Sequence, residues 1–482
     1  MEQRKSYKDA KGKAQAGETP MRPNTEVLYD GGLSRSSEES TVMVVERRAE
    51  VIQLELPLTP LDKQGRIKGA TTKRIPITKE MVWESYKKVR SNKGAAGIDN
   101  ETIAMYEDKL GDNLYVLWNR MSSGSYFPPP VLEVEIPKED GRKRKLGIPT
   151  VNDRVAQQVI KSYLEPRLES EFTVQSYGYR PLKNAHQSVA QVRKNVLEYR
   201  WVIDMDISGF FDNMSHKLLM KALDRHVSER WVKMYIKRWL ESPIEDRNRN
   251  IRYRDGKGTP QGGVISPILS NLFLHYTFDK WFGKTYPELK YVRYADDIIL
   301  HCNSHEESEK VLQAIKQRLT ECRLQVNEQK TKIVYCKKAH RKAQYKTVKF
   351  DFLGFSFQPR PASNKEGKMV LNYDCSISIK SEKKIAETFR KSNFHRWTES
   401  DIARIAEEFN PKIQGWINYY GRFRKYALMR IFRIFHWRLI KWAVNRYKRF
   451  RNSMHKAGQW IRHLAKSYPG LFVHWQHGFQ NA

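Results

Sequence analysis

Residues 291–302 read YVRYADDIILHC, and two neighbouring aspartates, Asp296 and Asp297, interrupt an otherwise apolar run. Carboxylates in contact repel each other, and removing them from water costs several kcal/mol unless another group compensates the charge. One interpretation is that the pair forms the turn of a β-hairpin, because turns favour aspartate. The other is that the pair binds Mg²⁺, which prefers oxygen ligands. The two interpretations are compatible, since the turn of a hairpin can present its side chains to a metal ion. The rest of the sequence must show whether a metal site is present.

A second segment with carboxylates, WVIDMDISGFF, spans residues 201–211 and begins with a β-strand pattern. A two-metal site for phosphoryl transfer needs carboxylates from at least two places in the chain. Asp204 and Asp206 are two residues apart, so their side chains point to the same face of a strand. The spacing to Phe211 makes Asp206 the better ligand, and Asp204 is assigned a structural or supporting role.

A glycine-rich segment, GTPQGG (258–263), precedes a strongly apolar helix pattern. Gly262 and Gly263 allow the backbone to approach a ligand closely. Gln261 can form a hydrogen bond with a nucleotide or with its template partner. The three segments follow one another in the order that a polymerase palm needs: the aspartate strand, then Pro-Gln-Gly, then aromatic-Ala-Asp-Asp.

The charge of the chain indicates a polyanionic partner. There are 87 Lys and Arg against 54 Asp and Glu, a formal net charge of +33. Residues 411–482 contain 15 Lys and Arg, no acidic residue and 16 aromatic residues, a composition that suits nucleic-acid binding. No stretch approaches the ~20 apolar residues of a membrane span, and the first residues lack a secretory signal. The four cysteines have no C-x-x-C spacing, which favours a reducing compartment over a zinc module.

Local patterns predict a mixture of helices and strands. Residues 1–72 show little periodicity and are predicted to be flexible. Thr78 is a candidate cap for the first ordered helix, and residues 131–149 alternate as a β-hairpin. A helix is expected over residues 151–169, and another is expected to start with Ser266 as its cap. The last hundred residues have a helical, amphipathic pattern. Without a regular β-α alternation, the pattern favours the α+β class.

These segments together resemble reverse transcriptases, most closely the endonuclease-lacking bacterial type of group II intron-encoded proteins. The matching segments are DISGFFD, TPQGGVISPILSNLFL and YADD in the palm, PKEDGRKRKLGIPTVNDRVAQQ and YGYRPLKNAHQ in the fingers, NEQKTKIVY and FDFLGFSF beyond the catalytic box, and PKIQGWINYYGRF in the maturase segment. Many relatives end in a Cys-rich endonuclease with paired C-x-x-C spacings. This chain has no such set of cysteines, so we expect no endonuclease.

The resemblance implies a right-hand polymerase fold of fingers, palm and thumb with a helical basic C-terminal region. The domain boundaries that it implies are a flexible extension at 1–72, fingers at 73–200, a palm with the catalytic aspartates at 201–365, a thumb and maturase domain at 366–450, and a basic C-terminal tail at 451–482.

The resemblance also implies the site. Asp206, Asp296 and Asp297 are assigned as catalytic metal ligands, with Ile207 in the same metal site, for two Mg²⁺ ions that Mn²⁺ could replace. Phe211 falls at the position of an aromatic that excludes a ribonucleotide 2′-hydroxyl; the alternative is that Phe211 is only a core residue.

Basic residues near these segments are the expected nucleotide contacts. Lys138 and Arg144 fall where cations of the fingers grip the triphosphate, although the run from Arg142 to Lys145 permits several registers. Arg180 is a further candidate for nucleotide or template contact. Lys330 is either a general acid for the leaving pyrophosphate or an ordinary solvated lysine.

The implied function is that of an RNA-directed DNA polymerase of a group II intron that also acts as a maturase in splicing and retrohoming. The expected partners are the intron RNA, target DNA and dNTPs, in a cytoplasmic bacterial ribonucleoprotein without membrane contact. The alternatives are a retron- or defence-type reverse transcriptase and a splicing-only maturase. Five cations form a candidate RNA-binding face: Arg422, Arg424, Lys425, Arg430 and Arg433. The alternative is that they are merely solvated side chains of an ordinary thumb helix.

Overall fold

A computed structural model describes residues 42–47, 50–55, 75–137, 143–363 and 366–480. The chain divides into two units, residues 1–73 and 74–482, which are considered separately. In the first unit, β1 (Val42–Arg47) and β2 (Glu50–Glu55) form an antiparallel hairpin. The rest of the predicted flexible extension at 1–72 lies outside the described residues.

The described part of the second unit begins, near its start, with the predicted cap. The Thr78 hydroxyl accepts a hydrogen bond from the Met81 amide (3.2 Å), and Val82, Tyr86 and Val89 form the buried side of the helix that follows. The hairpin expected over 131–149 is also present, and its strands form a sheet of order β4-β3-β6-β7. The elements up to Glu198 are α1 (Lys79–Asn92), α2 (Ile103–Asp108), α3 (Leu110–Ser123), β3 (Val131–Pro137), β4 (Lys143–Ile148), α4 (Val151–Glu169) and α5 (Ala185–Glu198).

The second unit also contains a four-stranded antiparallel sheet of order β10-β5-β9-β8. Its strands are β5 (Trp201–Met205), β8 (Lys290–Tyr294), β9 (Asp297–Cys302) and β10 (Lys332–Tyr335). Strands β8 and β9 form the hairpin that the sequence predicted, with Asp296 in its turn and Asp297 at the start of β9. Because Met205 pairs with Ile298, the end of β5 lies beside the tip of this hairpin.

Helices pack around this sheet and connect it to the earlier part of the second unit. They are α6 (Phe210–Asn213), α7 (His216–Leu223), α8 (Arg230–Glu241), α9 (Ser266–Leu274), α10 (Lys280–Thr285) and α11 (His305–Glu321), with the short strands β6 (Ile244–Glu245) and β7 (Ile251–Arg252) between α8 and α9. A π-helical turn, His275–Asp279, joins α9 to α10.

The predicted cap of α9 is wrong in detail. Ser266 is the first residue of the helix, Ile265 occupies the cap position, and no side chain caps the helix. The Ser266 hydroxyl instead lies 2.9 Å from the Thr259 hydroxyl. This hydrogen bond ties the start of α9 to the Pro-Gln-Gly segment, which explains why the serine is not used locally.

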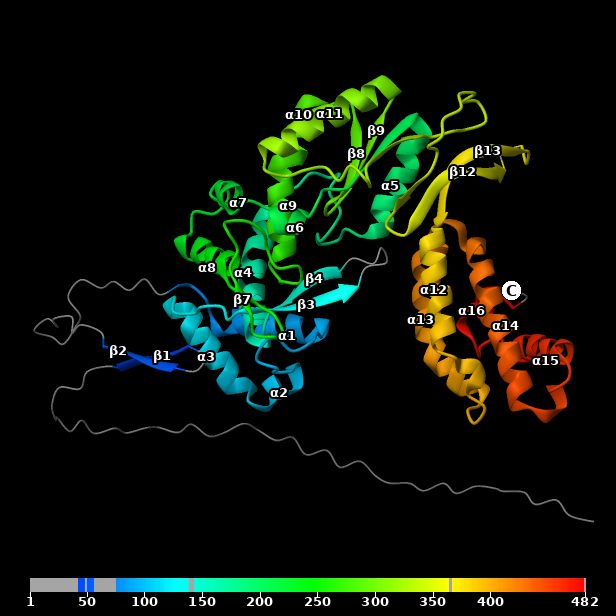
Figure 1. The fold of residues 1–482 in the computed structure, drawn as a ribbon, viewed down its shortest axis with the longest axis horizontal. Helices are drawn as coiled ribbons and strands as arrows, with labels where there is room; N and C mark the ends of the chain where they lie inside the picture. The colour runs from blue at the N-terminus through cyan, green and yellow to red at the C-terminus, as the bar shows by residue number, and fades with distance from the viewer. Residues whose placement is uncertain (1–41, 48–49, 56–74, 138–142, 364–365, 481–482) are drawn as a thin grey trace, which may run out of the picture. The chain divides into compact units, whose positions relative to one another are not determined.

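The C-terminal region consists of a three-stranded sheet of order β11-β12-β13 and a group of helices (Figure 1). The strands are β11 (Phe350–Phe352), β12 (Phe355–Ser363) and β13 (Met369–Ile377). The helices are α12 (Ile379–Lys391), α13 (Ile402–Arg424), α14 (Met429–Arg446), α15 (Met454–Ser467) and α16 (Val473–Gln476), with 3₁₀ turns at Phe394–Arg396, Lys425–Leu428 and Lys448–Phe450.

The residues predicted as a separate C-terminal tail belong to the hydrophobic core of these helices. Phe472, Trp475 and Phe479 are each at most 1% exposed and lie in the same cluster as Phe409 and Phe435. These three aromatic residues therefore pack inside the protein, whereas Tyr468 of the same segment is 63% exposed. Within the described part of the chain, no helix is long and apolar enough to cross a membrane.

Candidate active site

The segment NEQKTK, residues 327–332, holds Asp206 in place. Asn327 Nδ2 donates to Asp206 Oδ2 (3.0 Å), and Lys330 Nζ lies 3.1 Å from the same oxygen. The Asn327 amide also donates to the Asp206 carbonyl (2.8 Å), and the Asp206 amide donates to the Thr331 hydroxyl (3.4 Å). Lys330 therefore lies at the predicted site. Asn327 and Thr331 were not singled out from the sequence, although both lie in a segment that resembles the family.

The carboxylates at this end of the sheet carry strongly perturbed pKa values. Burial, together with the charges of Asp296 and Asp206, raises the pKa of Asp297 to about 7, while Lys330 and Arg144 oppose the shift. Burial also raises the pKa of Asp296, and burial raises that of Asp204 to about 7 against the opposing charge of a nearby lysine. Negative charge is thus gathered where water hydrates it poorly, and a cation would relieve the repulsion.

The donor chemistry of this site fits a hard divalent cation, but the present arrangement is not a closed ligand set. Among the described residues, no three His, Cys, Asp or Glu side chains converge on one point. Asn327 and Lys330 both engage Asp206 Oδ2, so an ion that binds through this oxygen would compete with Lys330. Ile207 is buried and its side chain is a hydrocarbon, so only its backbone carbonyl could serve as a ligand.

Two predicted nucleotide contacts that lie far apart in the sequence meet in the structure. Arg144 Nε donates to Gln261 Oε1 (3.0 Å) across 117 residues. The backbone supports this contact, because the Gly147 amide donates to the Gln261 carbonyl (2.7 Å). At Gly262, φ is +121° and a β-carbon would lie 2.5 Å from the Gly147 carbonyl oxygen, so the close approach requires glycine.

The basic run on β4 divides between two sides. Lys143 pairs with Glu135 (2.6 Å) and Lys145 pairs with Glu133 (3.0 Å), whereas Arg144 points to Gln261. Alternation of side chains along the strand accounts for this division. Among the described residues of the run, Arg144 is therefore the one that faces the Pro-Gln-Gly segment. Lys138 and Arg142 lie outside the described residues.

Phe211 and Arg180 have different surroundings. Phe211 is half-buried, its ring lies 5.3 Å from that of Phe210, and its carbonyl accepts a hydrogen bond from the Thr259 amide (2.8 Å).

Arg180 is not brought to the aspartates: its guanidinium donates to the Glu169 carboxylate and to the Thr173 and Ser176 carbonyls, and its side chain is 6% exposed. Arg180 thus holds its own loop together.

The five cations of the predicted RNA-binding face differ in their exposure and in their contacts. Arg422 and Arg433 are exposed, at the end of α13 and on α14. Arg430 is exposed and lies 3.8 Å from Glu382. The other two are half-buried: Arg424 donates to the Pro361 carbonyl (3.1 Å), and Lys425 lies 5.8 Å from the centre of the Phe479 ring.

The aromatic residues of GWINYY make contacts inside the protein. His186 Nε2 donates to the Tyr419 carbonyl (2.8 Å), and the Tyr419 hydroxyl donates to the Leu353 carbonyl (3.0 Å). The Trp416 ring meets the Phe389 ring edge-on at 5.4 Å. Tyr419 thus connects α13 to α5 and to the turn between β11 and β12, and Trp416 packs on α12, so these two rings are not a free stacking surface.

Comparisons with known proteins agree with the resemblance to group II intron-encoded reverse transcriptases. A family model described as reverse transcriptase (RNA-dependent DNA polymerase) matches residues 136–357, and one described as the group II intron maturase-specific domain matches residues 382–460. The chain is 32% identical to protein YkfC of Escherichia coli (strain K12) over 264 residues, which are 47% of this chain and 69% of that protein.

Two further likenesses are weaker in identity but longer. The chain is 25% identical to the group II intron-encoded protein LtrA of Lactococcus lactis subsp. cremoris, over 72% of this chain and 70% of that protein. A solved structure of telomerase from Candida albicans with a fragment of telomeric RNA is similar at a TM-score of 0.40 and 13% identity, over 74% of this chain and 67% of that one. The reverse transcriptase match and the mixed sheets and helices confirm the expected α+β right-hand polymerase fold. The chain belongs to the family of group II intron-encoded reverse transcriptases that carry a maturase domain.

Proposed function

We propose that this chain copies RNA into DNA at Asp206, Asp296 and Asp297, and that as a maturase it binds its intron RNA to promote splicing and retrohoming by target-primed reverse transcription. The observation that carries the polymerase proposal is the pairing of β5 with β9, which brings Asp206 beside the Asp296–Asp297 tip within a reverse transcriptase match. The maturase domain match carries the second part.

In the proposed reaction, the 3′-hydroxyl of a primer attacks the α-phosphorus of a dNTP. A new phosphodiester bond forms, the bond to the β-phosphate breaks, and pyrophosphate leaves. Asp206, Asp296 and Asp297 would hold two Mg²⁺ ions, which when bound stabilise the attacking and leaving oxygens. Arg144, oriented by Gln261, would bind the triphosphate. Lys330, once released from Asp206, would donate a proton to the pyrophosphate.

We assign fingers to 73–200, palm to 201–365 and thumb to 366–450, and we include residues 451–480 with the thumb because they share its core. Target DNA and intron RNA are the proposed macromolecular partners, and dNTPs are the proposed substrates. A retron- or defence-type enzyme is less well supported, because the maturase domain match covers residues 382–460. A splicing-only maturase is distinguished by experiment.

The purified protein should extend a DNA primer annealed to an RNA template when dNTPs and Mg²⁺ are supplied, and EDTA should stop the extension. Mn²⁺ should restore activity, because it accepts the same oxygen ligands. The same preparation should promote splicing of its intron RNA. If it promotes splicing but never extends a primer with either ion, the chain is a splicing-only maturase and the polymerase proposal is wrong.

Phe211→Val should weaken discrimination against ribonucleotides. A half-buried ring beside the Pro-Gln-Gly segment would exclude a 2′-hydroxyl by its bulk, and valine leaves room for it. The ratio of kcat/KM for dNTP to that for rNTP should fall by about tenfold or more, which corresponds to about 1.4 kcal/mol. Phe210→Leu, a change in the buried neighbour, is the control for general loss of packing. If an active Phe211 variant discriminates as well as the original protein, Phe211 is only a core residue and does not select the sugar.

A further inference from the structure

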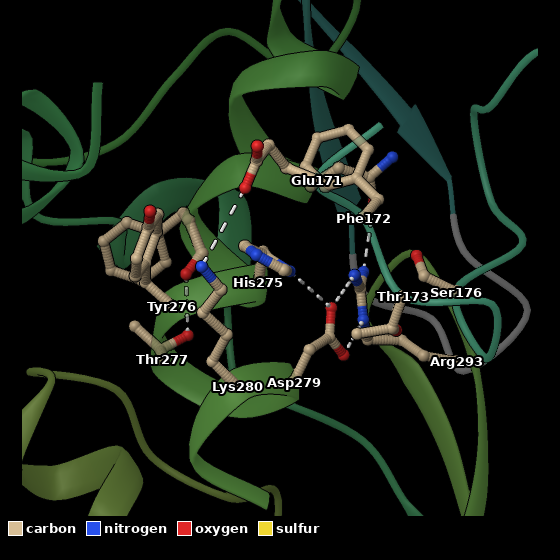
Figure 2. A network of polar contacts seen from close by, with 12 residues as sticks. Glu171, Phe172, Thr173, Ser176, His275, Tyr276, Thr277, Asp279, Lys280 and Arg293 are labelled. Atoms are coloured by element: carbon tan, nitrogen blue, oxygen red, sulfur yellow. Dashed lines mark hydrogen bonds and ion pairs between the residues drawn. The ribbon is translucent and has the colours of Figure 1, made fainter. Parts of the chain in front are cut away.

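A fully buried arginine, Arg293, lies three residues before Asp296. Arg293 on β8 and Asp279 are both 0% exposed and form an ion pair, in which Arg293 Nε donates to Asp279 Oδ1 (2.9 Å) (Figure 2). Arg293 Nη1 donates to Asn271 Oδ1 (3.0 Å) and to the Ala295 carbonyl (3.2 Å). The guanidinium thus bonds a carboxylate, an amide side chain and the backbone of the tip itself.

The π-helical turn His275–Asp279 supplies the carboxylate. Such turns insert an extra residue into a helix and often occur at functional sites. Here the turn ends at Asp279, which contacts the sheet in two ways: its Oδ1 accepts a second hydrogen bond from the Tyr291 hydroxyl (3.0 Å), and its Oδ2 pairs with Arg293 Nη2. Both oxygens of Asp279 are therefore used by strand β8.

Ala295, which the network reaches, is strained. Its φ is +57°, a left-handed conformation that is unfavourable for an L-residue, and it immediately precedes Asp296. Packing also confines this turn, because a β-carbon on Gly178 would lie 2.4 Å from the Ala295 amide nitrogen. Asn271 Nδ2 donates to the Gly178 carbonyl (2.8 Å), so one asparagine ties both Arg293 and the covering loop to α9.

We propose that Arg293, held by Asp279 and Asn271, is a positioning residue that keeps Ala295 left-handed and thereby aims Asp296 and Asp297. This inference rests on the proposed role of those aspartates. A buried ion pair contributes little net stability compared with apolar packing, so stability alone does not account for it. The planar fork of arginine can bond Asp279, Asn271 and the tip together, whereas a lysine ammonium is a single point charge.

The test compares Arg293→Lys with Arg341→Lys. Arg341 is also buried and donates to backbone carbonyls, those of Tyr199 and Cys336, at the end of β5 remote from Asp206. Both variants should lose thermal stability. Arg293→Lys should in addition lower kcat by roughly 10–100-fold, with the KM for dNTP changed by less than about twofold, because misplaced reactive groups cost rate rather than binding. It should also require more Mg²⁺ for half-maximal activity, and Arg341→Lys should change neither kcat nor this requirement.

Ala295→Gly provides a rescue that a merely structural role would not show. Glycine adopts positive φ readily, so adding Ala295→Gly to Arg293→Lys should recover several-fold of the lost kcat without restoring thermal stability. If Arg293→Lys does not fold, Asn271→Ala is measured in its place, since it leaves the Arg293–Asp279 pair intact. An unchanged kcat and Mg²⁺ requirement in the folded variant, or the absence of rescue, would overturn the proposal.

Asp296→Asn, measured in the same assay, distinguishes the proposed catalytic role of the aspartates from the proposed positioning role of Arg293. If Asp296→Asn is inactive and Arg293→Lys is fully active, the aspartates are catalytic and the positioning network is wrong. If Asp296→Asn is fully active, the proposed catalytic site itself is wrong.

Discussion

Asp296→Asn should abolish DNA synthesis on an RNA template while leaving the protein folded. Asparagine has the size of aspartate but lacks the negative charge that would bind a divalent ion. Because burial and the charge of Asp206 raise the pKa of Asp296, neutralising it removes repulsion. Its thermal unfolding temperature should therefore stay the same or rise. Primer extension should fall by at least roughly 10²–10³-fold, the loss typical when a group that stabilises the transition state is removed. Asp206→Asn should have the same effect on synthesis.

Asp204→Asn is the matched control for this prediction. Asp204 lies on β5, two residues before Asp206, and burial is the main cause that raises its pKa to about 7, as for Asp297. Among the described residues, its ion-pair partner is Lys332 (3.8 Å), whereas that of Asp206 is Lys330. Its loss should cost much less activity than the loss of Asp296. A folded Asp296→Asn variant that extends primers at near the original rate would show that the site has been assigned wrongly.

Neutralising Arg422, Arg430 and Arg433 to glutamine should impair splicing and leave primer extension on a simple template largely intact. Splicing by a group II-type intron is catalysed by RNA, so the protein contributes by binding and stabilising the folded intron, which needs cations rather than palm carboxylates. These three are the exposed members of the predicted face. Intron affinity should fall by about tenfold or more, and the slope of log K against log salt should flatten by about 0.7–0.9 per lost phosphate contact. Asp296→Asn should show the reverse pattern, with splicing retained and no DNA product.

A variant with the same charge change elsewhere controls for net charge. Lys237, Lys284 and Lys310 are exposed residues on α8, α10 and α11, and changing them to glutamine also removes three positive charges. If this control weakens intron binding as much as the thumb variant, the effect is a general one of charge. If the thumb variant keeps its splicing activity and salt slope, its cations are merely solvated. The RNA-binding surface would then have to be sought in the fingers and in the helix that begins after Thr78.

Local sequence patterns were sufficient to predict several helices and hairpins and the candidate carboxylates. Thr78 caps its helix, residues 151–169 form a helix, and Asp296 lies at a hairpin tip, all as predicted. These features depend on neighbours within a few residues, because caps, helical periodicity and hairpin turns are short-range patterns. The order of the aspartate segments also indicated the polymerase fold before any contact was known.

Contacts between side chains that are distant in the sequence depend on how the whole chain packs, and local patterns did not predict them. Arg144 was one of several equivalent cations until its strand placed it against Gln261, 117 residues away, with its neighbours paired to β3. Arg180, a candidate contact in the sequence, is turned inward because Glu169 and nearby carbonyls use its donors. Likewise, no periodicity marks Arg293 as a partner of Asp279, because a π-helical turn and a strand from different parts of the chain bring them together. Strand alternation determines the face on which a side chain lies, but its partner depends on how distant segments pack, and that information is not local.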